Sequence, residues 1–234
     1  MKWKEIWISR EKTHHIINNE PLYRYKFQQV LKFHDPGYAP AKKEDLWFHI
    51  DLGGRPAYSQ RFTRTFGYYF HKAAVNDKGN WYHIDPSGNR AYDQYFNWVG
   101  NYQDNTCVVK DTKNQYFHID SEGEPLYDGK YLYAGDYRNG IAVVRRQNRL
   151  CTHIDRDGLH IHDQYFLDLD VFHKDFARAR DERGWFHIDE SGHEIYSQRH
   201  NWIEPFYNGF ALIETSEGRK SIIDEVGETI HYIE

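Results

Sequence analysis

Several features that are common in chains of this length are scarce or missing here. Among 234 residues there are two cysteines, seven prolines and one methionine. No run of apolar residues is long enough to cross a bilayer, and the opening MKWKEIWISREK contains no apolar core of a signal peptide. Cys107 and Cys151 are interpreted as buried small apolar residues. We therefore expect no membrane partner, no disulfide framework and, by default, a cytoplasmic location.

The charge and motif content excludes further classes of function. The net charge is −5 and the isoelectric point about 6.3, whereas nucleic-acid-binding domains are usually basic. We therefore expect no nucleic-acid partner. No GxSxG, HExxH, P-loop or GxGxxG motif occurs, so no cofactor or metal is expected either. The apolar fraction is only 39% and the mean hydropathy is −0.89, which is low for a globular core.

Aromatic residues compensate for this low apolar content, and they recur in register. The chain has 19 Tyr, 14 Phe and 7 Trp. Segments such as WFHIDESGHEIY, which begins at Trp185, return almost from end to end. Their Asp positions are separated by 34 or 35 residues: Asp51, Asp85, Asp120, Asp155, Asp189 and Asp224. A fixed period of this size indicates a repeat protein.

Each repeat predicts a series of short antiparallel strands. A strand with a small second residue, such as KAAVN from Lys72, precedes a polar turn and the strand W-[FY]-H-I-D. A DxxG turn follows, and then a third strand and an aromatic-rich fourth segment. We expect a single repeat domain over 1–234 with a degenerate first repeat at 1–37, regular repeats at 38–71, 72–105, 106–140, 141–175 and 176–209, and a truncated last repeat at 210–234.

The predicted fold class is an all-β repeat protein of seven units, and we favour a seven-bladed β-propeller. One unit cannot bury both of its apolar faces, so the units must stack. A count of seven and a last repeat without its fourth segment favour a ring of blades. An open solenoid of β-hairpins is the alternative, because about 34 residues is short for a blade.

The same segments resemble the WG-repeat family of bacterial proteins. The similarity is clearest in FYNGFALIETSEGRKSIIDEVG from Phe206, in YRNGIAVV from Tyr137 and in each W-[FY]-H-I-D-x-x-G, and it extends over about 190 of the 234 residues. The chain differs by carrying an aromatic residue where the family has Gly after Trp. The resemblance implies a β-repeat scaffold, and it implies no activity.

A histidine recurs in the second strand, at His49, His83, His118, His153 and His187. Several imidazoles that converged on one point could bind a metal or an anion. The alternative is that each His forms hydrogen bonds within its own unit. We favour the structural interpretation, because a ligand site needs its residues in one place and a structural device is needed once per unit.

Departures from the repeat are the better candidates for a ligand site. In the fifth unit Asp168 replaces an aromatic residue, Asp170 replaces Gly, and Arg178 replaces Val; Glu204 occupies the Asp170 position of the next unit. These four could form one polar cluster that binds a ligand or performs acid–base chemistry. An exposed row of rings could also stack on sugars, from Trp98, Tyr133 and Trp202. Ion pairing and packing between units are the respective structural alternatives.

Three hypotheses for function follow. The first is a non-enzymatic scaffold that binds a protein or a carbohydrate on one face. The second is a hydrolase or lyase that acts on a polar glycan-like substrate through the fifth-unit cluster. The third is a purely structural repeat. We expect that repeat positions lining a ligand site vary between units, whereas positions of a bare scaffold are uniform.

Overall fold

The computed structural model describes residues 3–233, and its elements are short β-strands apart from one 3₁₀ turn, η1 (Trp3–Glu5). The strands form seven sheets. The chain divides into two compact units, Met1–Pro125 and Leu126–Glu234, and each is described by itself.

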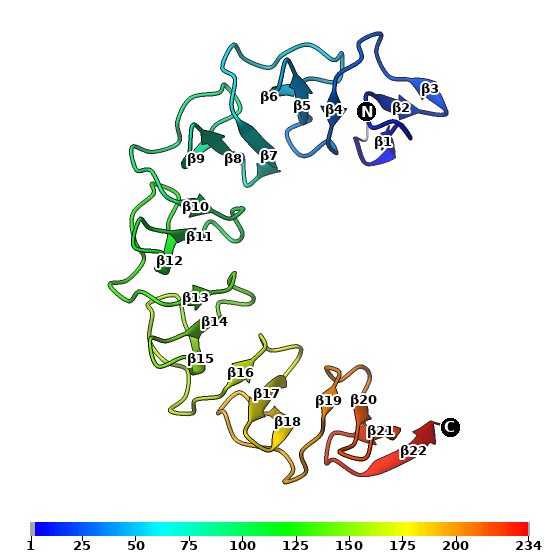
Figure 1. The fold of residues 1–234 in the computed structure, drawn as a ribbon, viewed down its shortest axis with the longest axis vertical. Coiled ribbons are helices and arrows are strands. Elements are labelled where there is room, and N and C mark those ends of the chain that lie inside the picture. The colour runs from blue at the N-terminus through cyan, green and yellow to red at the C-terminus, as the bar shows by residue number, and fades with distance from the viewer. Residues whose placement is uncertain (1–2, 234) are drawn as a thin grey trace. The chain divides into compact units, whose positions relative to one another are not determined.

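The first unit holds four antiparallel sheets of three strands each (Figure 1). In spatial order they are β1 (Trp7–Ile8), β2 (His15–Ile17) and β3 (Glu20–Pro21); β4 (Gln29–Val30), β5 (Ala39–Lys43) and β6 (Leu46–Ile50); β7 (Arg64–Tyr69), β8 (Lys72–Asp77) and β9 (Asn80–Ile84); and β10 (Trp98–Val99), β11 (Cys107–Lys110) and β12 (Tyr116–Ile119).

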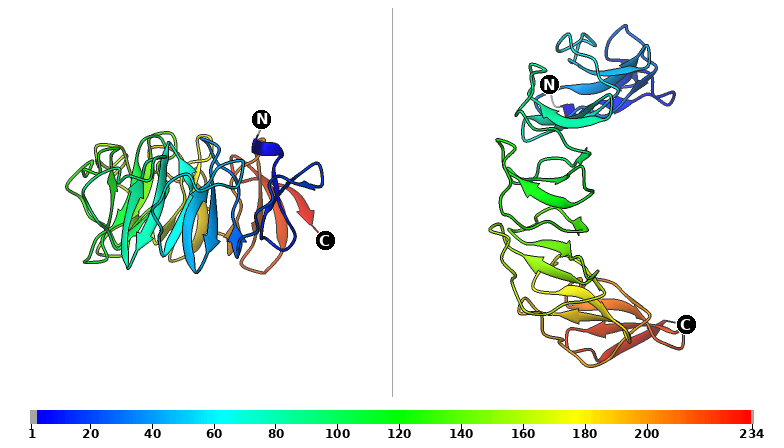
Figure 2. Two further views of the ribbon diagram at one scale, coloured as in Figure 1. Left: turned by 90° about the horizontal axis from the view of Figure 1, so that it is seen from above. Right: turned by 60° about the vertical axis from the view of Figure 1, so that its left-hand side comes forward.

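The second unit holds three sheets, and its last sheet has a fourth strand (Figures 1 and 2). In spatial order they are β13 (Tyr133–Ala134), β14 (Ala142–Arg145) and β15 (Cys151–Ile154); β16 (Asp168–Leu169), β17 (Ala177–Asp181) and β18 (Gly184–Ile188); and β19 (Trp202–Ile203), β20 (Phe210–Glu214), β21 (Lys220–Asp224) and β22 (Thr229–Ile233).

The middle strand of each regular sheet carries the small residue seen in the repeat. Ala73 of β8 pairs with Ile84 of β9, and both are fully buried. The same small position is buried in every regular sheet, at Ala39, Ala73, Cys107, Ala142, Ala177 and Ala211. A small side chain here lets large apolar groups of neighbouring strands fill the space above the backbone.

The expected third strand of the repeat is mostly not a regular strand. After the DxxG turn the chain touches the sheet edge only at isolated bridges, such as Ile84–Arg90 and Trp81–Phe96. It curls because Tyr92, between these bridges, turns inward to reach a buried histidine. The first and last sheets have a strand at this edge, the two-residue β3 and the longer β22.

The DxxG turn is built as predicted from its composition. The Oδ1 atom of Asp85 accepts hydrogen bonds from the backbone N–H groups of Ser87 and Asn89, both at 2.9 Å. Gly88 follows with φ +83°. A Cβ atom on Gly88 would lie 2.6 Å from Cγ of Tyr58, so the tyrosine of the preceding repeat packs directly on the turn.

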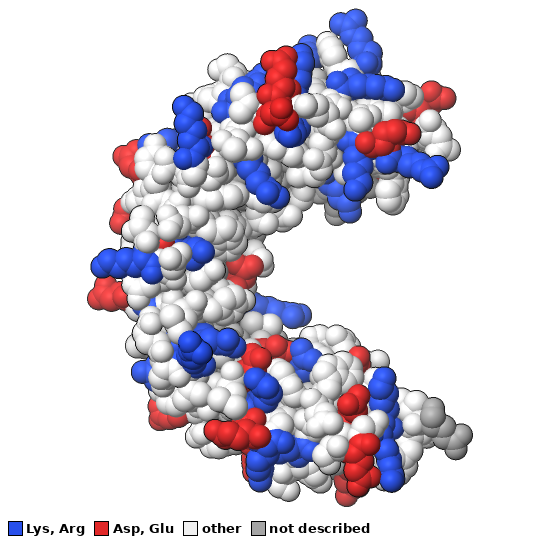
Figure 3. Space-filling model, viewed as in Figure 1, with Lys and Arg blue, Asp and Glu red and all other residues white. Residues whose placement is uncertain are grey.

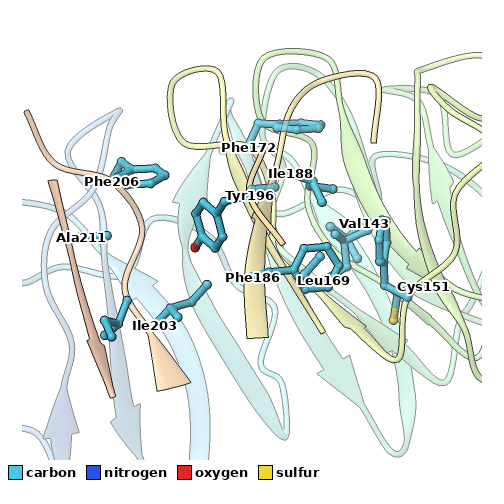
Figure 4. Packing of buried hydrophobic residues seen from close by; sticks show 14 of the residues in the cluster. Val143, Cys151, Leu169, Phe172, Phe186, Ile188, Tyr196, Ile203, Phe206 and Ala211 are labelled. Carbon is cyan, nitrogen blue, oxygen red and sulfur yellow. The ribbon is translucent and has the colours of Figure 1, made fainter. Parts of the chain in front are cut away.

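Apolar side chains from successive sheets form one core in the second unit. Phe186 and Leu169 lie between Val143 on one side and Ile203 on the other (Figure 4). Sheets therefore stack face to face, and each covers a face that its neighbour exposes. Seven sheets of this kind confirm the predicted fold class: an all-β repeat protein whose seven units are β-propeller blades.

Candidate functional site

The repeated histidines are buried and join one sheet to the next. His83 of β9 donates from Nε2 to the carbonyl of Gly100, at 3.0 Å, and its Nδ1 lies 2.6 Å from the Tyr92 hydroxyl. Gly100 directly follows β10 of the next sheet. The same three-part contact, which we call the His clamp, recurs at His15, His49 and His187, and His153 forms a variant of it.

The hydrogen-bond partners determine the protonation state of each clamp. A backbone carbonyl can only accept, so Nε2 must carry the proton. In a neutral imidazole Nδ1 is then the acceptor, and the tyrosine hydroxyl donates to it. At His187 these contacts are 2.8 Å to the Glu204 carbonyl and 2.5 Å to the Tyr196 hydroxyl. Both ring nitrogens are used within the fold, which supports the structural interpretation of these histidines.

Burial keeps the clamp histidines neutral. It lowers the pKa of His83 to about 3 and that of His49, His153 and His187 to about 4, because the charged form loses its hydration. The hydrogen bond to the carbonyl acts in the opposite direction and only partly offsets this effect.

The fifth unit carries a variant of the clamp. His162 replaces the tyrosine, and its Nε2 lies 2.9 Å from Nδ1 of His153. The backbone N–H of Gln164 donates to Nδ1 of His162 at 3.3 Å. Nε2 of His162 therefore carries the proton and donates it to His153. Burial also lowers the pKa of His162, so both rings are neutral.

The predicted fifth-unit acids are held in two ion pairs. Asp168 begins β16 and lies 3.3 Å from Nη2 of Arg145 in the preceding sheet. Asp170 follows β16 and pairs with Arg178, with 2.5 Å between Oδ2 and Nε. Arg178 also donates to the Ile203 carbonyl at 2.8 Å, so it connects β17 to β19. Asp168 is thus paired with the preceding sheet and Asp170 with an arginine of its own sheet, and the two acids do not share a partner.

The other predicted residues lie at the start of first strands. Trp98, Tyr133 and Trp202 open β10, β13 and β19 and are 38%, 51% and 40% exposed. Trp98 belongs to the first unit, and the other two belong to the second. The backbone carbonyl of Glu204 is the acceptor of a His clamp.

A pocket of about 350 Å³ opens in the second unit next to these strand ends. It includes two predicted residues, Tyr133 and Asp170. Its lining comes from the segments around β13, β14, β16 and β19: Tyr133, Gly135, Asp136, Arg138, Val143, Leu169, Asp170, Val171, His173, Pro205 and Tyr207. We call it the strand-end pocket.

The strand-end pocket combines aromatic rims with the carboxyl group of an exposed residue, Asp136. Tyr133 and Tyr207 are each more than half exposed, and Tyr207 lies 5.0 Å from the His173 ring. Although the residue is exposed, partial desolvation of its carboxyl group by the surrounding chain raises the pKa of Asp136. Arg138 adds a cationic group to the lining. Rings with adjacent donors and acceptors suit a ligand with both apolar faces and hydroxyl groups.

Sequence reasoning missed Asp136, Arg138, His173 and Tyr207. A signal was present, because Arg138, His173 and Tyr207 occupy one repeat position, directly after an aromatic residue that is buried in every copy. That position is Gln103 in another unit. The His clamp of the first repeat was also not predicted from the sequence. There, His15 and Tyr23 are eight residues apart, whereas the partners in the other clamps are nine apart.

The charged surface is mixed. On the face shown in Figure 3, acidic and basic side chains alternate within each unit. Within residues 3–233, His, Cys, Asp and Glu side chains form no group of three that could hold a metal ion. That same part of the chain has no helix of the length and apolarity needed to cross a membrane.

Seven antiparallel sheets, six of three strands and one of four, define a β-propeller type of repeat protein. The WG containing repeat family matches residues 118–149, which confirms the resemblance seen in the repeats. No curated protein matches the sequence.

Solved structures are similar in fold at low identity. The computationally designed Ika8 protein is 14% identical over 97% of this chain and 83% of its own, with a TM-score of 0.51. BamB from Moraxella catarrhalis is 10% identical over 92% of this chain and 77% of its own, with a TM-score of 0.49. The WD40 beta propeller domain of Doa1 is 12% identical over 70% and 65%, with a TM-score of 0.35.

Proposed function

We propose that the chain is a non-enzymatic recognition scaffold that binds a carbohydrate in the strand-end pocket. The observation that supports this most strongly is variation. Positions that hold the sheets together are nearly uniform from repeat to repeat, whereas one lining position is Arg138, His173 and Tyr207 in three successive units. Packing between similar sheets does not require this lining position to vary from unit to unit, whereas a binding site for a ligand of defined shape does.

The chemistry of the lining favours a sugar ring. The exposed rings of Tyr133 and Tyr207 offer apolar faces for C–H groups. Asp136 provides a carboxyl group that can accept hydrogen bonds from ligand hydroxyls. Arg138 supplies further donors for ring or hydroxyl oxygens.

Ion pairing is the reason to prefer binding over catalysis. Asp168 and Asp170 are each bonded to an arginine, so neither is an isolated carboxyl group of the kind that general acid catalysis uses. The hydrolase or lyase hypothesis remains the alternative outcome of the test below.

The test is a glycan array probed with the purified chain, followed by calorimetric titration of the best neutral oligosaccharide. We expect Tyr207→Ala and Asp136→Asn to weaken binding about tenfold or more, with unchanged far-UV circular dichroism. Tyr232→Ala, an exposed tyrosine outside the pocket, is the matched control. Absence of glycan binding would contradict the proposal, and release of new reducing ends would favour the enzyme.

A protein ligand is the second candidate function. β22 is the edge strand of the last sheet, with Ile230 and Tyr232 55% and 65% exposed. Exposed apolar edges pair with strands of other chains. A partner that protects the β22 amides from hydrogen exchange, without affecting the strand-end pocket, would favour this function.

A further inference from the structure

A second pocket, of about 310 Å³, lies in the first unit and takes no part in the proposed carbohydrate site. It is formed by the segment before β4, the β5–β6 hairpin and the DxxG turn that follows. Its lining is aromatic and cationic: Tyr25, Phe27, Lys43, Glu44, Leu46, Phe48, Gly54, Arg55, Pro56 and Arg61. We call it the Arg61 pocket.

Arg61 is fixed in this pocket by its own backbone neighbourhood. Its guanidinium carbon lies 4.0 Å from the centre of the Phe48 ring. Nη1 donates to the carbonyls of Ser59 and Gln60, at 2.9 and 2.8 Å. Within residues 3–233, Nε and Nη2 of Arg61 have no hydrogen-bond partner. One edge of the guanidinium is thus held in place and the other edge is available.

Arg199 in the second unit occupies the same repeat position, and there the free edge is used. Its guanidinium carbon lies 3.6 Å from the Phe186 ring, and its Nη1 donates to two backbone carbonyls at 3.2 Å. Nε donates to Asp181 at 2.8 Å, and Nη2 donates to Glu194 at 2.5 Å. An arginine in this position therefore takes two carboxylates when the chain supplies them.

The Arg61 pocket lacks both of these acids. Asp181 pairs across its hairpin with Gly184, and Lys43 pairs in the same way with Leu46. Lys43 therefore occupies the repeat position of Asp181. Glu194 bridges Ile188 as Pro56 bridges Ile50, so Pro56 stands where Glu194 does. A cation and an imino acid have replaced the two carboxylates, and the positive charge of Arg61 is left without a counter-charge.

The remaining charges of the pocket partly pair with each other. Glu44 lies 3.9 Å from Nζ of Lys43, and Arg55 lies 3.8 Å from Asp51. All four of these side chains are at least 39% exposed. Lys43 and Arg55 thus each have a carboxylate nearby, whereas Arg61 forms no ion pair in the part of the chain that the structure describes.

An apolar wall adjoins the unpaired arginine. Tyr25 replaces the glutamine that follows the clamp tyrosine by two residues in other repeats, as at Gln60 and Gln94. Its ring lies against the turn, with Cδ2 3.0 Å from where a Cβ of Gly54 would be. Leu46 is 42% exposed beside it. A ligand here would meet a ring and an aliphatic side chain on one side and a guanidinium on the other.

We propose that the Arg61 pocket binds a small carboxylic acid with an apolar body. The carboxylate would accept from Nε and Nη2 of Arg61 in the manner that Arg199 shows with its two acids, and a charge-assisted pair of this kind is strong and directional. The apolar body would cover Tyr25 and Leu46. A volume of about 310 Å³ suits a one-ring ligand.

The test is titration of the purified chain with phenylacetate, followed by calorimetry and by ligand-observed NMR saturation transfer. Phenylacetamide, which has the same shape and no charge, is the ligand control. We expect phenylacetate to bind at least about tenfold more tightly than phenylacetamide, since one hydrogen bond to a charged group contributes that much.

Two substitutions restore the second-unit arrangement. Pro56→Glu and Lys43→Asp place carboxylates where Glu194 and Asp181 stand, and each should abolish phenylacetate binding while the melting temperature is kept or raised. Glu194→Gln, at the matched position of the other unit, should leave phenylacetate binding unchanged. Equal binding of phenylacetate and phenylacetamide, or undiminished binding by a folded Pro56→Glu protein, would overturn the proposal, as would no binding of phenylacetate at millimolar concentration.

Discussion

The His clamps and the strand-end pocket are built from neighbouring positions of the same repeat, yet they behave in opposite ways. At His187 the ring contacts the Glu204 carbonyl, and the adjoining segment carries Tyr207 on the pocket rim. The clamp residue is fully buried, and Tyr207 is 57% exposed. The clamp position is histidine in all units but the last, which has Ile222, because it must satisfy buried polar atoms, whereas a position that faces solvent is free to vary. The clamp therefore maintains the stack, and the rim is where we propose that a ligand binds.

The largest expected effect is the loss of folding stability at acidic pH, which acts through the clamp histidines. Since burial lowers the clamp pKa values to about 3 or 4 from 6.5, the folded chain binds fewer protons than the unfolded chain between these values. Stability is therefore fully present above pH 6.5 and falls as the pH drops toward 4, by about 1.4 kcal/mol per pKa unit for each histidine. We expect cooperative unfolding in this window, measured by tryptophan fluorescence and circular dichroism.

The control for the acid transition is an exposed histidine. His193→Gln should leave the midpoint unchanged, because the His193 side chain is 72% exposed. A chain that keeps its fold and its tryptophan spectrum at pH 3.5 would contradict the role assigned to the clamps.

A smaller effect is expected where the preceding tyrosine packs on the turn. Gly88→Ala places a methyl group 2.6 Å from Cγ of Tyr58 and also strains a φ of +83°, so we expect a loss of about 2–4 kcal/mol in urea unfolding. Gly79→Ala is the control, since its φ is +96° and no atom lies within 4 Å of the added carbon. Equal losses for both variants would show that only backbone strain matters.

Removal of one clamp hydroxyl is expected to lower the free energy of unfolding by less than the Gly88→Ala substitution does. Tyr196→Phe leaves Nδ1 of the buried His187 without a donor, and we expect a loss of about 1–3 kcal/mol in the free energy of unfolding. Tyr207→Phe removes a hydroxyl from the exposed rim and should change stability by less than about 0.5 kcal/mol. The comparison fails if the two substitutions have the same effect on thermal or chemical unfolding.

The smallest effect on stability is expected when the fifth unit is given the tyrosine that the other clamps have. His162→Tyr replaces the second histidine of that clamp by the usual hydroxyl donor. Stability at pH 7 should change little, and the acid transition should move to lower pH, because one group whose pKa is lowered by burial has been removed. A midpoint that moves to higher pH would show that the histidine pair has a role beyond replacing tyrosine.

Much of the architecture could be predicted from periodicity. The spacing of Asp51, Asp85 and Asp120 predicted the seven sheets, and the DxxG composition predicted the Asx-type turn seen at Asp85. The recurrence of His49 and His83 predicted a structural role, because one site cannot need a residue in every unit. These features depend on contacts that are local or repeat with the period.

The candidate sites were predicted only in part. Asp170 was predicted as a departure from the repeat and Tyr133 as one of a row of exposed rings, and both line the strand-end pocket. Asp136 and His173 were missed, since both join the pocket only through neighbours on other strands. The Arg61 pocket depends on comparing Arg61 with Arg199, and their partners became visible only once the hairpins were paired.

The sequence by itself determined the period, the strand and turn order and the buried face of each unit, because alternation and turn chemistry act over a few residues. The tertiary structure decided which carbonyl each histidine reaches and where an arginine is left without an acid. These depend on atoms about 17 residues or more apart, and only the stacking of sheets brings them within hydrogen-bonding distance.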